Sequence, residues 1–226
     1  MSPRTGTGPP PRRVLWVEGS DDNAVVRSIC GAHAVPEKFS VEPRQGVERL
    51  LAGLAVKVRN PALECFGVVV DANGDARARW TAIRSSLARV GYRDVPSSPD
   101  PAGTVVAAVD RLPRFGAWIM PDNVSPGALE DFAALLVPSG DELWVRAGEA
   151  LDSIPKELRR FSAVRRSKAH IHTWLAWQED PGSPMGQAIG KRDLDASAPA
   201  AQRFVAWLRR LMVEDVAAPP RVAPTT

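Results

Sequence analysis

Acidic residues follow three apolar segments of this 226-residue chain. Glu18 directly follows the run VLWV, Asp71 directly follows CFGVVV, and Asp122 comes shortly after AWIM. If the three runs are neighbouring parallel strands, their carboxyl ends meet at one edge of a sheet, where the loops of open α/β sheets bind ligands. Carboxylate oxygens are the ligands that Mg²⁺ and Mn²⁺ prefer. The pattern therefore predicts a divalent-metal site at that edge.

More oxygen donors lie close to these positions in the sequence. Asn73 and Asp75 come within four residues of Asp71, and an acidic pair opens the helix expected after the last strand. The full set of candidate metal ligands is Glu18, Asp71, Asn73, Asp75, Asp122, Glu130 and Asp131. Any one of them also has a plain structural explanation, because an acid after a strand often caps a helix or turn.

Two further acids, Asp21 and Asp22, fall in the first turn of a predicted helix. Negative side chains there interact favourably with the helix dipole, which explains their presence without a ligand. We therefore place them outside the candidate site.

Apolar periodicity predicts the elements that would position these residues. Short apolar runs alternate with stretches of helical spacing through the first 120 residues, which is typical of a mostly parallel sheet flanked by helices. The expected strands are 14–17, 38–42, 65–70, 105–109 and 117–120, and the intervening helices are 21–33, 45–59 and 75–90. The remaining expected helices, at 127–136, 139–153, 167–179 and 198–213, make the last third helical. The predicted fold class is α/β.

Proline-rich, polar composition marks both ends of the chain. Residues 1–12 and 216–226 are expected to be flexible tails, because they bury too little apolar surface to offset the entropy of ordering. Residues 13–215 then form a single domain, with the helical elaboration at about 127–215.

The composition excludes several classes of protein. No apolar run is long enough to span a bilayer, and the first residues contain no hydrophobic signal segment. Two cysteines and three histidines are too few for a disulfide framework or a Cys/His zinc site. No phosphate loop or serine-hydrolase elbow is found. We expect a cytoplasmic protein that does not contact a membrane.

Basic residues cluster late in the chain. Lys168 lies among Arg159, Arg160, Arg165 and Arg166, although the net charge of the chain is only +3. These side chains could bind nucleic-acid phosphates, with salt-dependent affinity, or they could form a solvated surface. His170 and His172 are two residues apart on a predicted helix and therefore point in different directions, so they are not expected to share a metal ion.

The segment VEGSDD at 17–22, together with VVDAN at 69–73, resembles the toprim fold of topoisomerases, primases and nucleases of the overcoming-lysogenization-defect type. The later blocks resemble a bacterial family of toprim-like proteins of uncharacterised function (DUF3226), over about residues 13–213. These blocks are WIMPDN at 118–123, LEDF at 129–132, SKA at 167–169 and TWLAWQED at 173–180.

The resemblance implies a role for individual residues. Glu18 matches the toprim glutamate, a metal ligand or general acid/base, and Asp71 matches the first aspartate of an Asp-x-Asp pair. The second aspartate is replaced by Asn73, which removes a negative charge, so Asn73→Asp is expected to tighten metal binding. Glu130, Asp131 and Lys168 are candidate counterparts of the additional acids and the lysine near the scissile phosphate in the lysogenization-defect nucleases.

Two functions follow from this resemblance. The first is a Mg²⁺- or Mn²⁺-dependent nuclease or related phosphodiester-processing enzyme. The alternative is a non-catalytic nucleic-acid-binding or regulatory module with a weakened metal site. Topoisomerase activity is disfavoured because the single tyrosine, Tyr92, lies in a predicted loop. An ATPase on a separate polypeptide is a further expected partner, since the lysogenization-defect type carries a fused ATPase that this chain lacks.

Overall fold

The computed structural model describes residues 12–214 and contains a five-stranded sheet of order β2-β1-β3-β5-β4. The strands are β1 (Arg13–Val17), β2 (Ser40–Pro43), β3 (Cys65–Asp71), β4 (Thr104–Val106) and β5 (Arg114–Met120). Strands β2, β1, β3 and β5 pair in parallel, which confirms the predicted mostly parallel sheet. The edge strand β4 pairs antiparallel with β5 and is shorter than expected. Apart from Arg12, the two expected tails lie outside the described residues.

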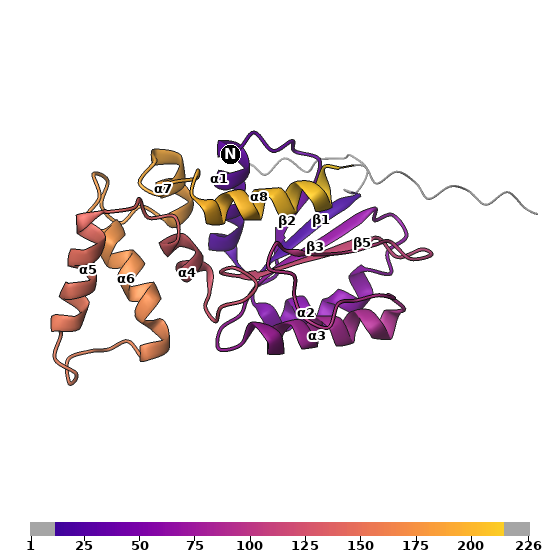
Figure 1. Ribbon diagram of the computed structural model, residues 1–226, viewed down its shortest axis with the longest axis horizontal. Coiled ribbons are helices and arrows are strands. Elements are labelled where there is room, and N and C mark those ends of the chain that lie inside the picture. Colours follow the sequence, from indigo (N-terminus) through magenta and orange to yellow (C-terminus); the bar gives the residue numbers. More distant parts are fainter. Residues whose placement is uncertain (1–11, 215–226) are drawn as a thin grey trace, which may run out of the picture.

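Residues 12–214 contain eight α-helices. They are α1 (Ser20–Ala32), α2 (Val47–Lys57), α3 (Ala76–Val90), α4 (Leu129–Ala134), α5 (Glu142–Ser153), α6 (Arg166–Leu175), α7 (Met185–Lys191) and α8 (Pro199–Met212). Helices α2 and α3 cover one face of the sheet, whereas α1 and α8 cover the other (Figure 1). Helices α5 and α6 form a hairpin that projects away from the sheet (Figure 1). None of the helices in this part of the chain is long and apolar enough to cross a membrane.

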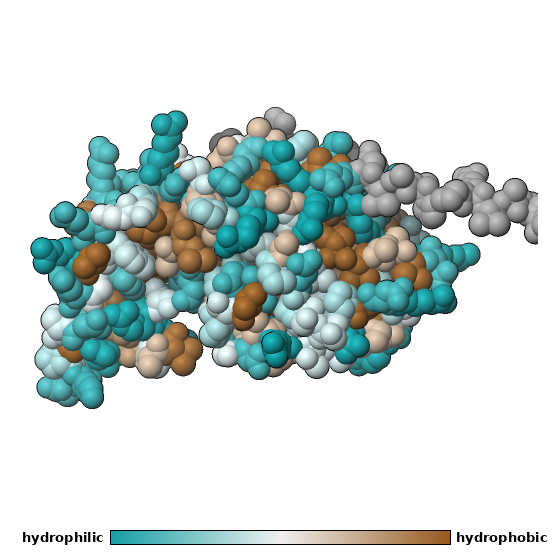
Figure 2. All heavy atoms as spheres, viewed as in Figure 1, coloured by the Kyte–Doolittle hydropathy of each residue, from teal (hydrophilic) through white to brown (hydrophobic). Residues whose placement is uncertain are grey.

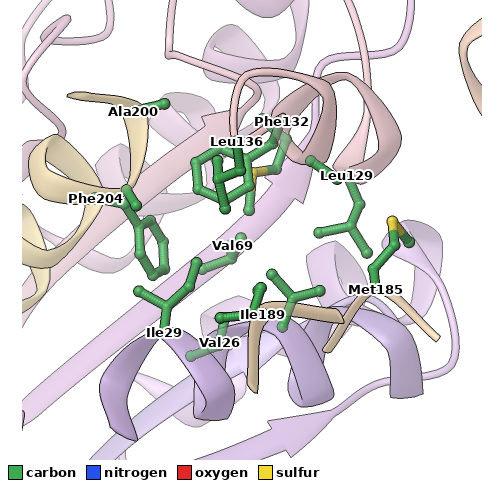
Figure 3. Packing of buried hydrophobic residues seen from close by; sticks show 14 of the residues in the cluster. Val26, Ile29, Val69, Leu129, Phe132, Leu136, Met185, Ile189, Ala200 and Phe204 are labelled. Atoms are coloured by element: carbon green, nitrogen blue, oxygen red, sulfur yellow. The ribbon is translucent and has the colours of Figure 1, made fainter. Parts of the chain in front are cut away.

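The central strand β3 is buried on both faces and divides the core into two layers. Its residues alternate in direction, as they must in a strand: Phe66, Val68 and Val70 belong to the layer beneath α2 and α3. Val69 belongs to the opposite layer, where side chains from α1, α4, α7 and α8 converge on it (Figure 3). Helix α4 is thus fixed to the sheet through its apolar side chains.

Helix α7 was not predicted from the sequence. Its seven residues, MGQAIGK, are short and contain two glycines, which disfavour a helix on propensity alone. Packing explains it, because a Cβ at Gly186 would lie 2.8 Å from the Cβ of Ala24 on α1. Only glycine allows α7 to approach α1 so closely, and burial of Met185 and Ile189 then stabilises the helix.

Two arginines at the amino ends of the strands bind the last turn of α8. The Arg114 side chain, in a residue only 8% exposed, donates from Nη2 to the carbonyl oxygens of Leu211 and Glu214, at 2.6 and 2.8 Å. Arg13 donates from Nη1 to the carbonyl of Met212 at 2.7 Å. These donors satisfy carbonyl groups that have no partner within the helix.

We expect Arg114→Met to lower the free energy of unfolding by about 1–3 kcal/mol, because it leaves buried carbonyl groups without a donor. Urea denaturation measures the change. Arg146→Met is the matched control: it removes an exposed pair with Glu149 and should cost less than about 1 kcal/mol. Equal stability of the two variants would contradict this role of Arg114.

Candidate metal centre

The parallel pairing of β1 and β3 places two predicted ligands side by side. Val17 pairs with Val69, so Glu18 and Asp71 both lie at the carboxyl edge of the sheet. The backbone N–H of Asp71 donates to Glu18 Oε1 at 2.8 Å. The N–H of Leu129, the first residue of α4, donates to Asp71 Oδ1 at 3.0 Å. The expected proximity of Glu18 and Asp71 is therefore observed, and α4 is attached at the same point.

A pocket of about 320 Å³ opens over these residues. Five acidic side chains and one lysine contribute to its wall, from the turn after β1 and from α1, β3, α4 and α6. The lining residues are Glu18, Gly19, Ser20, Asp21, Asp22, Gln45, Gly46, Asp71, Leu129, Glu130 and Lys168. We call this the acidic pocket. Of the predicted site residues, it brings together Glu18, Asp71, Glu130 and Lys168.

The acids of the pocket repel one another. Burial raises the pKa of Asp71 to about 8, with further contributions from the charges of Glu18, Asp22 and Glu130. Burial also raises the pKa of Asp22 to about 7, and the charges of Glu18 and Glu130 add to this effect. Burial likewise raises the pKa of Glu18, opposed by the hydrogen bond from the Asp71 N–H and by the charge of Arg79. At neutral pH the pocket therefore favours protons or cations.

Asp22 is the member of the pocket that the sequence analysis excluded. It is only 7% exposed, and its Oδ2 accepts from the Gly19 N–H at 3.0 Å, as expected in the first turn of a helix. Its other oxygen, Oδ1, is buried and has no hydrogen-bond partner. A buried carboxylate oxygen without a donor is costly, which indicates that a proton or a cation belongs there. The signal that could have identified it is its position in the first turn of the helix that begins directly after Glu18.

Three other candidate ligands use their carboxylates in local hydrogen bonds and do not line the acidic pocket. Asp75 caps α3, accepting from two backbone N–H groups at 2.8 and 3.2 Å. Asp131 accepts from the N–H three residues before it at 2.8 Å, which caps α4. Asp122 accepts three hydrogen bonds within its own turn, and these lower its pKa despite the opposing effect of burial. The capping of a helix or a turn therefore explains why Asp75, Asp122 and Asp131 are acidic.

Asn73 also lies outside the lining of the acidic pocket. Its backbone adopts a left-handed conformation, with φ of 53°, and it exchanges two backbone hydrogen bonds with Gly127. Asparagine tolerates this conformation better than most residues, so the turn itself explains the residue type. The side chain is exposed to solvent.

From this placement we expect Asn73→Asp to have little effect on metal binding, in place of the tightening expected from the sequence. Aspartate also tolerates the left-handed conformation, and the new charge would lie outside the acidic pocket. We expect the affinity for Mn²⁺ to change by less than about twofold, since exposed charges are screened. Isothermal titration calorimetry measures the affinity, with Asn73→Gly as the uncharged control. Clear tightening in the aspartate variant alone would place position 73 among the ligands.

The donor set of the pocket suits a hard divalent cation. Glu18, Asp22, Asp71 and Glu130 offer only oxygen atoms, and Asp22 Oδ1 has no other partner. A bound cation would also relieve the repulsion that raises the pKa values of these acids. Within residues 12–214, however, no three Asp, Glu, His or Cys side chains converge closely enough to hold an ion in their present positions. Side-chain rotation would have to accompany binding.

The four predicted phosphate-binding arginines lie between α5 and the start of α6, and they divide into two pairs. Arg166 makes bidentate hydrogen bonds to Asp152, and Arg159 donates to two carbonyl oxygens at the end of α5. Arg160 and Arg165 are exposed to solvent. The end of the molecule formed by α5 and α6 shows both hydrophilic and hydrophobic residues on its surface (Figure 2), and Leu158 and Val164 are exposed between the two helices. Arg160 and Arg165 are thus the better placed of the four for a ligand.

The fold and the pocket together define the class of protein: an α/β domain with clustered carboxylates at the carboxyl edge of a mostly parallel sheet. The chain belongs to the family described as a protein of unknown function (DUF3226), whose model matches residues 12–213. No curated protein and no solved structure matches the chain.

Proposed function

We propose that this protein is a Mg²⁺- or Mn²⁺-dependent nuclease, or a related phosphodiester-processing enzyme, with a toprim-like acidic site. The observation that carries the proposal is the acidic pocket, where Glu18, Asp22, Asp71 and Glu130 adjoin the ammonium group of Lys168. Metal-dependent phosphodiester cleavage needs carboxylates for cations and a positive group for the phosphate.

The toprim relationship is part of this proposal. Its support is the position of Glu18 after the first strand and of Asp71 after the neighbouring parallel strand, both at the same edge of the sheet. The departure from that pattern is Asn73, which faces solvent. Asp22 would supply the negative charge that Asn73 lacks.

Each residue of the pocket has a separate role in the proposed reaction. Glu18, Asp22 and Asp71 would hold the cation, which supplies Lewis acidity toward a phosphate oxygen. Glu18 would also take and return a proton, and burial raises its pKa, which favours the protonated form. Lys168, half-exposed at the rim, would contact the phosphate and offset its charge. Arg165, one turn earlier, would bind the adjoining backbone.

A direct test incubates the purified protein with supercoiled plasmid and with single-stranded RNA in Mg²⁺, Mn²⁺ or EDTA. Cleavage that requires the metal supports the proposal and distinguishes DNA from RNA as substrate. In parallel, calorimetry at low salt compares Mn²⁺ binding by the wild type and by the Glu18→Ala/Asp71→Ala double variant. Binding that persists in the double variant would place the metal elsewhere and overturn the proposed site.

The second candidate is a non-catalytic, toprim-like nucleic-acid-binding or regulatory module with a weakened metal site. The observation that favours it is the use of Asp75, Asp122 and Asp131 in local hydrogen bonds. Binding of nucleic acid without cleavage, in the presence of either Mg²⁺ or Mn²⁺, would support it.

The toprim resemblance also suggests a separate ATPase as a proposed partner. Co-purification with an ATPase from the native host would support that association.

A further inference from the structure

A protein cation already lies in the acidic pocket. Lys168, from α6, donates from Nζ to Glu130 Oε1 on α4 at 2.6 Å. The Glu130 side chain is only 13% exposed, whereas that of Lys168 is 52% exposed. The carboxylate is therefore enclosed by the fold, while the lysine reaches it from the solvent side.

This ammonium partly neutralises the pocket. The charge of Glu130 raises the pKa values of both Asp22 and Asp71. The hydrogen bond with Glu130 raises the pKa of Lys168, with Coulombic contributions from Glu130 and Asp21. The ammonium thus compensates an acid that interacts with the two most perturbed carboxylates. A divalent ion at these acids would compete for the same oxygen atoms.

We propose that Lys168 is the resident counter-cation of the acidic pocket, and that a divalent cation binds by displacing its ammonium group from Glu130. This inference rests on the proposed function, because it takes the pocket as the metal site. The half-exposed side chain has room to rotate toward solvent without moving α6. Glu130 then becomes available as a ligand together with Glu18, Asp22 and Asp71.

Displacement has a consequence for nucleic-acid binding. The charge of Arg165 acts on Lys168, which places the two cations close together at the start of α6. Once released from Glu130, the ammonium joins this exposed positive charge and is free to bind a phosphate. Metal and polyanion should therefore strengthen each other's binding, and the coupling must be reciprocal.

Acetylation of the wild-type protein tests the displacement directly. Lysines are labelled briefly with an amine-reactive acetylating reagent, with and without MnCl₂, and quantified by mass spectrometry. We expect Mn²⁺ to speed labelling of Lys168 by about threefold or more, because the ammonium leaves its ion pair. Lys57 and Lys191, which pair with Glu42 and Asp180, are internal controls that should not change. Unchanged or slower labelling of Lys168 at saturating Mn²⁺ would overturn the inference.

Calorimetry with MnCl₂ on two matched variants gives the second readout. Lys168→Met removes the competing cation and should tighten Mn²⁺ binding by about tenfold. Arg165→Met removes a nearby exposed charge that makes no ion pair with Glu130, and should tighten binding by less than about twofold. Equal effects of the two substitutions would mean that Lys168 acts only through its net charge, which contradicts displacement.

The two proposals fail in different ways. If Mn²⁺ binds neither the wild type nor Lys168→Met, the metal site itself is wrong and both proposals fall. If Mn²⁺ binds both with equal affinity and Lys168 labelling does not change, the metal site stands and only the displacement is overturned. Binding by Lys168→Met but not by the wild type would show that the acids can bind Mn²⁺ but that Mn²⁺ does not displace the lysine, which also overturns the inference.

Discussion

Glu18→Gln is expected to lower metal-dependent cleavage of nucleic acid by about 10³-fold. Glutamine keeps an oxygen that accepts the hydrogen bond now made by the Asp71 N–H, so the edge of the sheet should remain intact. It removes, however, a negative charge and a site for proton transfer from the acidic pocket. Initial rates of cleavage of a fluorescent oligonucleotide in Mn²⁺ measure the loss.

Glu64→Gln is the matched control for this experiment. Glu64 pairs with Arg12 and Arg13 at the amino end of the sheet, opposite the acidic pocket. We expect cleavage by this variant to remain within about twofold of the wild type, because Glu64 does not line the acidic pocket. Unaltered cleavage by Glu18→Gln would show that the chemistry takes place elsewhere.

The second large effect is on stability: Asp71→Asn should raise the free energy of unfolding, measured in EDTA at pH 8, by a few kcal/mol. The pKa of Asp71 is about 8 in the folded protein, against 3.8 for the ordinary side chain. Between these pH values the folded state binds more protons than the unfolded state, so wild-type stability falls as pH rises. Asparagine carries no charge, and its oxygen can still accept from the Leu129 N–H.

Urea denaturation at pH 5, 6.5 and 8 gives the slope of this dependence. The gain in free energy of unfolding of Asp71→Asn over the wild type should be smallest at pH 5 and largest at pH 8. Asp122→Asn is a control of opposite sign: hydrogen bonds lower the pKa of Asp122, so its charged form stabilises the fold and the substitution should destabilise it. If Asp71→Asn is no more stable than the wild type at pH 8, the repulsion inferred for the acidic pocket is wrong.

The strands that carry Glu18 and Asp71 could be predicted because their sequence signals are local. Each is a continuous apolar run that ends in an acid, as expected of buried parallel strands, and the structure pairs them in parallel as predicted. The antiparallel direction of β4 could not be predicted. The direction of a strand depends on the neighbour with which it pairs, and the three residues of β4 do not contain that information.

The acids were harder to assign, because helix caps and metal ligands use the same residue types at the same positions. Asp75 and Asp131 cap helices, whereas Asp22 occupies a comparable first-turn position and also reaches the acidic pocket. The difference lies in α4 and α6, whose packing brings Glu130 and Lys168 over Asp22 but not over the other two. Local sequence cannot show which helix ends will be enclosed.

The attachment of α8 to the sheet also bears on how the chain folds during synthesis. Arg13 and Met212, joined by a hydrogen bond, are 199 residues apart. All five strands leave the ribosome before α8. Leu211 of α8 packs against the sheet at Gly67 and Gly116. Until α8 emerges, one apolar face of the nascent sheet lacks this cover, and such surfaces favour aggregation. This layer of the domain must therefore be completed late, by contacts of high sequence separation that form slowly.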